Sequence, residues 1–206
     1  MAPRSKRDRS QGFSLIELMV VVIIIITIAA MAILQMGPAL QGAQEDAAMR
    51  QVLDQLRQAR EYSIANRRYV QVTFPTNVIG GTTYYQVQMT LRNDLTTGAA
   101  VVNPILSTVT IEPGVPYALT GMPDTPDGYG NSNQIYFGGV AGGPVGGMLF
   151  QSDGELVSGT TFLPINGTVF LGIAGQPSTG RAVTVLGTTG RIRGWRSSGS
   201  TTWVQF

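Results

Sequence analysis

The sequence predicts an α+β protein in which one long N-terminal helix packs on antiparallel β-sheet. A 22-residue apolar run covers residues 13–34, and a second stretch up to residue 66 carries apolar residues at helical spacing. The remainder consists of short β-rich segments separated by Gly and Pro. A helical segment followed by a run of strands is typical of the α+β class.

The apolar run, placed in a segment 13–36, is long enough to span a membrane. A helix needs about 20 apolar residues to cross the hydrocarbon core of a bilayer. Glu17 is the one charged residue of residues 13–34, and an acid inside such a segment costs about 2.5–3.5 kcal/mol on insertion scales. We therefore expect Glu17 to have a partner or a role.

A second helical segment, residues 37–68, continues the first. Gly37-Pro38 should bend or loosen the helix, because proline lacks a backbone N–H and clashes with the preceding turn. Glu45 and Asp46 near the start, and Arg67 and Arg68 near the end, suit the helix dipole. The apolar stripe of this segment consists of Met49, Val52, Leu53, Leu56, Ala59 and Ile64.

Residues 69–206 form the predicted β-rich domain. A turn at residues 79–81 should separate two strands, 69–74 and 83–91, and residues 113–133 and 138–147 read as Gly/Pro loops. Further strands are predicted at 108–112, 134–137, 148–150, 169–173, 181–186, 190–195 and 201–205.

Charge and composition indicate the orientation of the chain in the membrane and the absence of disulfides. Residues 1–12 carry four basic groups and one acid, whereas residues 13–206 carry ten Arg against eleven acids. A basic flank ahead of an apolar run places residues 1–12 in the cytoplasm and the C-terminal bulk outside it. The chain has no Cys, so the exported domain must be stable without disulfides.

The N-terminal pattern resembles that of type IV prepilins and pseudopilins: a basic leader, then Gly12-Phe13, then Glu17 inside an apolar helix. An ordinary secretory signal would have a shorter apolar core and an A-x-A-like site, and a plain single-pass anchor would not explain Glu17. The resemblance implies a type IV pilin-like fold. It also implies cleavage after Gly12 by prepilin peptidase, N-methylation of Phe13, and pairing of Glu17 with the terminal amine of a neighbouring subunit.

The same resemblance implies a location and a set of partners. Before assembly, we expect a single-pass protein of the bacterial inner membrane, with a cytoplasmic N-terminus and a periplasmic C-terminal domain. After assembly, we expect the protein in a pilus or pseudopilus. The expected partners are the peptidase, other pilin or pseudopilin subunits, the inner-membrane assembly platform, and membrane lipid before assembly.

Downstream, the chain resembles the GspH/FimT family of minor pseudopilins and minor pilins. Three blocks carry this resemblance, at residues 56–66, 150–154 and 181–193, although Glu155 replaces the usual basic residue after Asp153-Gly154. We expect Arg60 to pair with an acid or cap a sheet edge, and Asp153-Gly154 to form a hairpin turn. The resemblance implies a structural subunit of a type IV pilus or of a type II secretion pseudopilus. A major, fibre-forming pilin is the rival interpretation.

Four C-terminal arginines support a second alternative, a minor pilin that binds DNA during natural transformation. Arg181, Arg191, Arg193 and Arg196 lie in a stretch without acids, close to two Trp residues. Arg side chains bind phosphates and aromatic rings stack on bases, and some FimT-type pilins bind DNA through a similar Gly-Arg-x-Arg stretch. The competing interpretation is a charged surface or a subunit contact.

Catalysis is not predicted. The sequence contains no His or Cys, no recognisable catalytic carboxylate pair, and no glycine-rich phosphate loop. We therefore expect no enzyme activity, no cofactor and no metal site.

Overall fold

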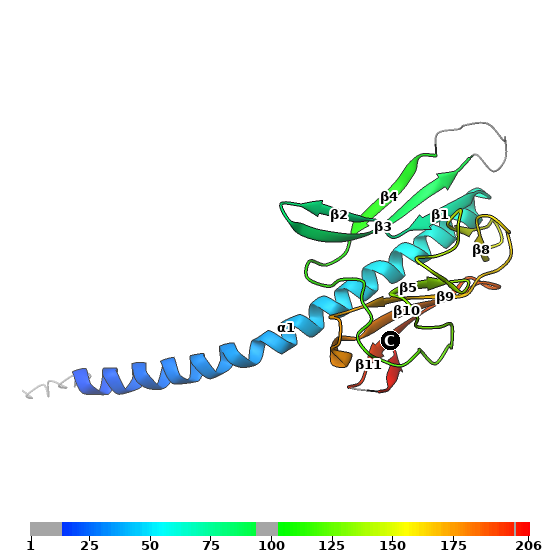
Figure 1. The fold of residues 1–206 in the computed structure, drawn as a ribbon. Helices are drawn as coiled ribbons and strands as arrows, with labels where there is room; N and C mark the ends of the chain where they lie inside the picture. The colour runs from blue at the N-terminus through cyan, green and yellow to red at the C-terminus, as the bar shows by residue number, and fades with distance from the viewer. Residues whose placement is uncertain (1–13, 94–102, 200) are drawn as a thin grey trace, which may run out of the picture. The chain divides into compact units, whose positions relative to one another are not determined.

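The computed structural model describes residues 14–93, 103–199 and 201–206. A single long helix, α1 (Leu15–Asn66), precedes the strands (Figure 1). The chain forms two compact units, a first one that ends at Gln41 and a second one, Gly42–Phe206. Helix α1 contributes to both units, and its path is helical through Gly37 and Pro38.

In the first unit, α1 exposes its apolar side chains. Leu15 is 78% exposed and Ile26 is 61% exposed. The Thr27 hydroxyl donates a hydrogen bond to the Ile23 carbonyl at 2.8 Å, so this polar group is satisfied within the helix. By length and composition, α1 is the one helix among the described residues that could cross a membrane.

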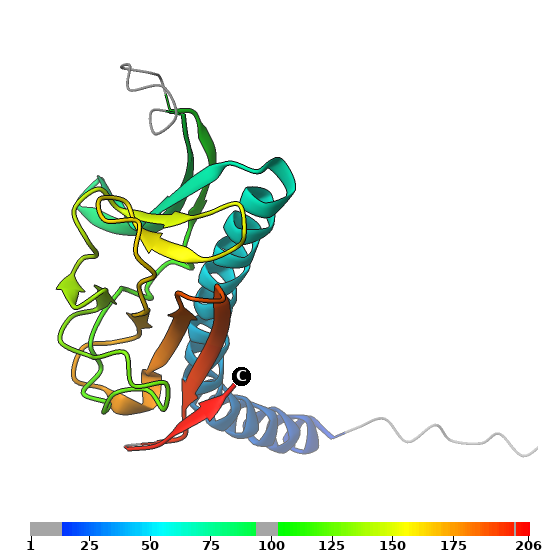
Figure 2. The ribbon, with the colours of Figure 1, turned by 90° about the vertical axis from the view of Figure 1, so that its right-hand side faces the viewer.

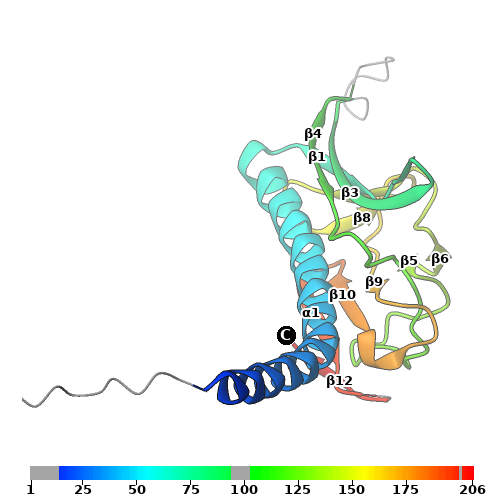
Figure 3. The same cartoon turned by 90° about the vertical axis from the view of Figure 1, so that its left-hand side faces the viewer.

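The second unit places the remainder of α1 against two antiparallel sheets (Figure 3). The first sheet has the order β2-β3-β1-β7-β8, with β4 also paired to β3. Its strands are β1 (Tyr69–Thr73), β2 (Thr76–Ile79), β3 (Thr82–Arg92), β4 (Ile105–Thr110), β7 (Met148–Phe150) and β8 (Leu156–Ser158).

The second sheet has the order β12-β11-β10-β9-β5-β6. Its strands are β5 (Ile135–Phe137), β6 (Val140–Ala141), β9 (Gly167–Leu171), β10 (Arg181–Leu186), β11 (Arg191–Ser197) and β12 (Trp203–Gln205). A short 3₁₀ helix, η1 (Pro177–Thr179), precedes β10. The predicted pilin-like α+β architecture is thus confirmed.

One apolar cluster joins the helix to both sheets. Its buried side chains come from α1, from the first sheet and from the second, for example Leu56, Val72 and Val183. Burial also raises the pKa of the Tyr117 hydroxyl, which donates to the Gln86 carbonyl at 3.0 Å. The predicted helix stripe is buried except for Ile64, which is 39% exposed.

Helix α1 and β11 approach each other closely at Gly194. A Cβ at this position would lie 2.7 Å from Leu53 Cδ1 and 3.4 Å from Met49 Sδ. Figure 2 shows the red C-terminal strands beside the helix, and the Phe206 ring lies 4.9 Å from the Arg50 guanidinium. Because Gly194 has no side chain, the helix packs directly on the second sheet.

Helix α1 ends in a Schellman motif that uses an arginine instead of the usual glycine. Arg67 has a φ of 51°, and its N–H donates to the Ile64 carbonyl at 3.4 Å. The Arg68 N–H donates to the Ser63 carbonyl at 3.2 Å. The dipole explanation for Glu45 and Asp46 is wrong, because the continuous helix has no terminus there.

The first predicted hairpin contains an additional strand. Strands β1 and β2 pair with β3 in one continuous register, with Thr73 opposite Gln88 and Thr76 opposite Tyr85. Pro75 lies between β1 and β2 and lacks an N–H, so it cannot donate a hydrogen bond to β3. Its carbonyl still accepts from the Gln86 N–H of β3 at 2.9 Å. Strands β2, β6 and β8 were not predicted. Every residue of β2 and β6 is exposed, so neither shows the alternation of a half-buried strand.

Replacing Gly167 by Ala should destabilise the second unit by about 1–3 kcal/mol. The added methyl would overlap the Phe137 ring and lie 2.6 Å from the Tyr136 carbonyl oxygen. Chemical denaturation of the full chain in detergent, followed by Trp fluorescence, measures the change. Gly42→Ala is the control, since nothing lies within 4 Å of its added methyl. It should be neutral or stabilising by up to about 1 kcal/mol, and equal destabilisation by both variants would contradict the steric explanation.

Candidate functional site

The predicted assembly residue, Glu17, lies at the start of α1. Gly12 and Phe13 are outside the described residues. Glu17 is exposed in the first turn of α1, where the Leu18 N–H already donates to the Ser14 carbonyl at 3.1 Å. A carboxylate at this position is favoured by the unpaired N–H groups and the positive dipole end of the helix.

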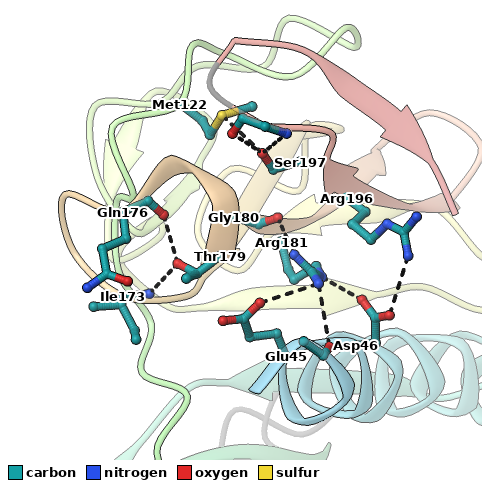
Figure 4. A network of polar contacts seen from close by, with 12 residues as sticks. Glu45, Asp46, Met122, Ile173, Gln176, Thr179, Gly180, Arg181, Arg196 and Ser197 are labelled. Carbon is teal, nitrogen blue, oxygen red and sulfur yellow. Dashed lines mark hydrogen bonds and ion pairs between the residues drawn. The ribbon is translucent and has the colours of Figure 1, made fainter. Parts of the chain in front are cut away.

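Arg181 is a buried ion-pair centre. Its Nε donates to Asp46 Oδ1 at 2.6 Å, and its Nη2 lies 3.3 Å from Glu45 Oε2. The side chains of Arg181 and Glu45 are 5% and 4% exposed. Further donation to the carbonyls of Gly180 and Gly42, at 3.0 and 3.5 Å, uses more of the guanidinium. Arg181 thus connects β10 to α1 (Figure 4).

Arg196 lies at the edge of the same network. Its Nη1 is 3.7 Å from Asp46 Oδ2, and its side chain is 52% exposed. Figure 4 shows both arginines directed at Asp46. Two acids of the helix therefore compensate two arginines that are far away in the sequence.

Arg191 and Arg193 share Asp127 as an acidic partner. Arg193 Nη1 donates to Asp127 Oδ1 at 2.9 Å, whereas Arg191 Nη2 lies 4.0 Å away. Asp127 Oδ2 also accepts from the Thr184 hydroxyl at 2.5 Å and from Trp195 Nε1 at 3.2 Å. The loop that carries Asp127 is thereby held on β10 and β11.

These contacts correct the predicted charge of the C-terminal region. The stretch contains no acid of its own, but Glu45, Asp46 and Asp127 bring three negative charges to its four arginines. Trp195 is 6% exposed, so its ring is not available for stacking on a base. The partners were missed because they lie in other segments, and nothing in the local sequence marks them.

Arg60 connects two hairpin turns. Its Nε donates to the Gly154 carbonyl at 3.3 Å and its Nη2 to the Thr189 carbonyl at 3.1 Å. The Asp153-Gly154 turn joins β7 to β8, as predicted, and the Thr189-Gly190 turn joins β10 to β11. A Cβ on Gly190 would overlap the Gly154 carbonyl oxygen, so the two turns are in direct contact. We call this contact the Arg60 clasp.

Removing the guanidinium of Arg60 should loosen the contact between the two sheets. Arg60→Met keeps the aliphatic stem but loses two charge-assisted hydrogen bonds, and should cost about 1–3 kcal/mol in the free energy of unfolding. Arg57→Met is the matched control on the same helix, because Arg57 forms an exposed pair with Asp54 at 3.9 Å. That control should change stability by less than about 0.5 kcal/mol. Equal effects of the two variants would contradict the clasp.

Arg181→Met should destabilise the second unit strongly. The change leaves the buried Glu45 without the Arg181 charge, and breaking a buried pair costs about 3–5 kcal/mol. Arg196→Met, at the exposed edge of the network, should cost at most about 1 kcal/mol. Urea denaturation of the two variants measures the difference, and a small effect for Arg181→Met would refute the anchoring role.

Comparison with known proteins identifies the N-terminal segment. Residues 7–33 match the family model of the prokaryotic N-terminal methylation motif. No curated protein and no solved structure matches the chain. The match includes Gly12, Phe13 and Glu17 and overlaps the exposed apolar part of α1. The chain therefore carries the methylation motif of the type IV prepilin and pseudopilin class at the start of a pilin-like α+β fold.

Proposed function

We propose that this chain is a minor pilin or pseudopilin of the GspH/FimT type, built into a type IV pilus or a type II secretion pseudopilus. The observation that carries the proposal is the methylation motif of residues 7–33, which overlaps the exposed apolar start of α1. Prepilin peptidase cleaves after Gly12 and methylates Phe13. The role is structural, and no catalytic step by this chain is involved.

Before assembly, the apolar part of α1 anchors the protein in the inner membrane. Side chains such as Ile23, Ile26 and Ile28 are more than half exposed, and lipid removes them from water. The basic leader stays in the cytoplasm and the β-rich unit lies in the periplasm. In the filament, neighbouring subunits and the assembly platform replace the lipid contacts.

Glu17 sets the position of one subunit against the next in the filament. Cleavage after Gly12 creates a positive amine at Phe13, and the amine of a neighbouring subunit compensates the Glu17 carboxylate. Both charges lie in a medium of low dielectric constant, where an unpaired charge is costly. Correct placement of one subunit against the next therefore lowers the free energy of the filament.

The Arg60 clasp supports the GspH/FimT assignment. The three sequence blocks that carry this resemblance contribute Arg60, Gly154 and the turn at Gly190, and these meet in one contact. A shared structural role accounts for their occurrence together in one chain. A minor subunit should be scarce in sheared filaments, whereas a major pilin would be their main component.

Uptake of DNA is the second candidate function. Arg191 favours it, because its side chain is 47% exposed and its distance to Asp127 is 4.0 Å. The buried Arg181 does not contribute a surface charge. Salt-dependent binding of a short DNA duplex by the processed chain would support this function.

Changing Glu17 to Gln should separate processing from assembly. The leader should still be removed and Phe13 methylated, because the cleavage site is intact, and intact-mass spectrometry detects both. Incorporation into filaments should fall about tenfold or more, since the amine of the neighbouring subunit loses its counter-charge. Immunoblots of sheared filaments measure this against the membrane pool.

Asp54→Asn is the control for this experiment. Asp54 lies on the same helix in the second unit, and its side chain is 75% exposed. The change removes the same charge and should leave incorporation unaffected. Normal incorporation of the Glu17→Gln variant would refute the pairing.

A further inference from the structure

A basic groove lies beside the Arg60 clasp. It has a volume of about 600 Å³ and runs between α1 and the turn that joins β10 to β11. The residues that determine its chemistry are Arg57, Arg60, Glu61, Leu186, Arg191 and Ile192. All of them belong to the second unit.

The groove carries excess positive charge. Three of its residues are arginines, and Glu61 is the one acid among its lining residues. Arg60 donates to two carbonyl groups, which do not compensate its charge. The three arginines therefore make the electrostatic potential in the groove positive.

The acids nearest to Arg57 and Arg191 compensate them weakly. Arg57 is 3.9 Å from Asp54 and Arg191 is 4.0 Å from Asp127, with side chains 55% and 47% exposed. Asp127 already accepts closer hydrogen bonds from Arg193 and Thr184. The pair of Arg57 with Asp54 is exposed and contributes little, and Arg191 is the more distant of the two arginines that share Asp127. The two guanidinium groups can therefore pair with a better-placed anion.

The apolar walls indicate which kind of anion fits. Leu186 and Ile192 are partly buried and line the same groove as the arginines. A peptide with both carboxylate and aliphatic side chains can pair with the guanidinium groups and cover these walls. A phosphodiester backbone would use the charges but would leave the aliphatic surface in water.

We propose that the groove binds an acidic, partly aliphatic peptide segment of a neighbouring filament subunit. The proposal rests on the proposed function, because a filament places such a subunit beside this one. Carboxylates of the segment pair with Arg57 and Arg191, and its aliphatic side chains pack on Leu186 and Ile192. Arg60 holds the two sides of the groove together through the clasp.

Binding of a labelled peptide tests the groove directly. The processed full chain in detergent micelles is titrated into a short peptide of alternating Glu and Val, and fluorescence anisotropy is recorded over a salt series. A peptide of alternating Gln and Val, and micelles without protein, serve as controls. The acidic peptide should bind with an affinity that falls as salt increases, and the Gln peptide should bind more weakly.

Two substitutions in opposite directions make the test specific. The double change Arg57→Gln and Arg191→Gln should weaken binding about tenfold or more, because two charge-assisted contacts are lost. Changing Glu61 to Gln should tighten it roughly two- to fivefold, the range that corresponds to one exposed charge pair. The matched control, Arg67→Gln with Arg68→Gln, removes the same charge from two exposed residues outside the groove lining and should leave the affinity unchanged.

Several outcomes would overturn the proposal. These are no salt-dependent binding by the unaltered chain, or equal loss in the two double variants. Binding of a short DNA duplex by the unaltered chain, with no binding of the acidic peptide, would assign the groove to nucleic acid instead. Cleavage, methylation and Glu17-dependent incorporation are measured separately, so failure of the groove is distinguishable from failure of the proposed function.

Discussion

The packing of one apolar helix stripe against two sheets is the constraint on which the second unit depends. Leu53 and Leu56 of α1 share a cluster with side chains from both sheets, such as Val72 and Val183. Each fully buried aliphatic side chain contributes about 1.5–3 kcal/mol. Because the chain has no Cys, noncovalent interactions must hold the unit together. Gly194 shows how tight the arrangement is, since a methyl group there would meet the helix.

Apolar packing alone would not fix the helix along its axis, and arginine contacts supply that restraint at two places. Arg181 connects β10 to Glu45 and Asp46 near the start of the second unit, and Arg60 connects the helix to two turns further along. Charge-assisted hydrogen bonds are directional, whereas apolar contacts are not. A shift of the helix by one residue would break both sets. The two contacts therefore set the register of α1 against both sheets.

The fold class and the N-terminal motif could be predicted because their signals are local. Residues 13–34 are recognisable from composition alone, and Gly12, Phe13 and Glu17 lie within a few positions of one another. The helix stripe and the longer strands show their period in the sequence. Strand β2, by contrast, has four residues that are all exposed, so it shows no alternation between buried and exposed positions.

The surroundings of the arginines could not be predicted, because their partners are brought in by the tertiary fold. Arg181 pairs with acids 135 and 136 positions away, and Asp127 comes from a loop without regular structure. Counting charges within the C-terminal stretch therefore overestimates its field. The prediction that Arg191 and Arg193 share one face of a strand is consistent with their common partner, Asp127.

The clasp also explains where uncompensated charge remains. Arg57 and Arg191 are far apart in the sequence. They line one groove because the hydrogen bond from Arg60 to the Thr189 carbonyl connects the helix to the β10–β11 turn. Asp46 lies 2.6 Å from Arg181 and Asp127 lies 2.9 Å from Arg193, whereas the acids beside Arg57 and Arg191 are about 4 Å away. Strongly paired arginines stabilise the unit and are unavailable to a partner. Weakly paired arginines lose little free energy when they exchange an acid of this chain for an acid of a partner. The groove is therefore where pairing with an acidic partner is most favourable.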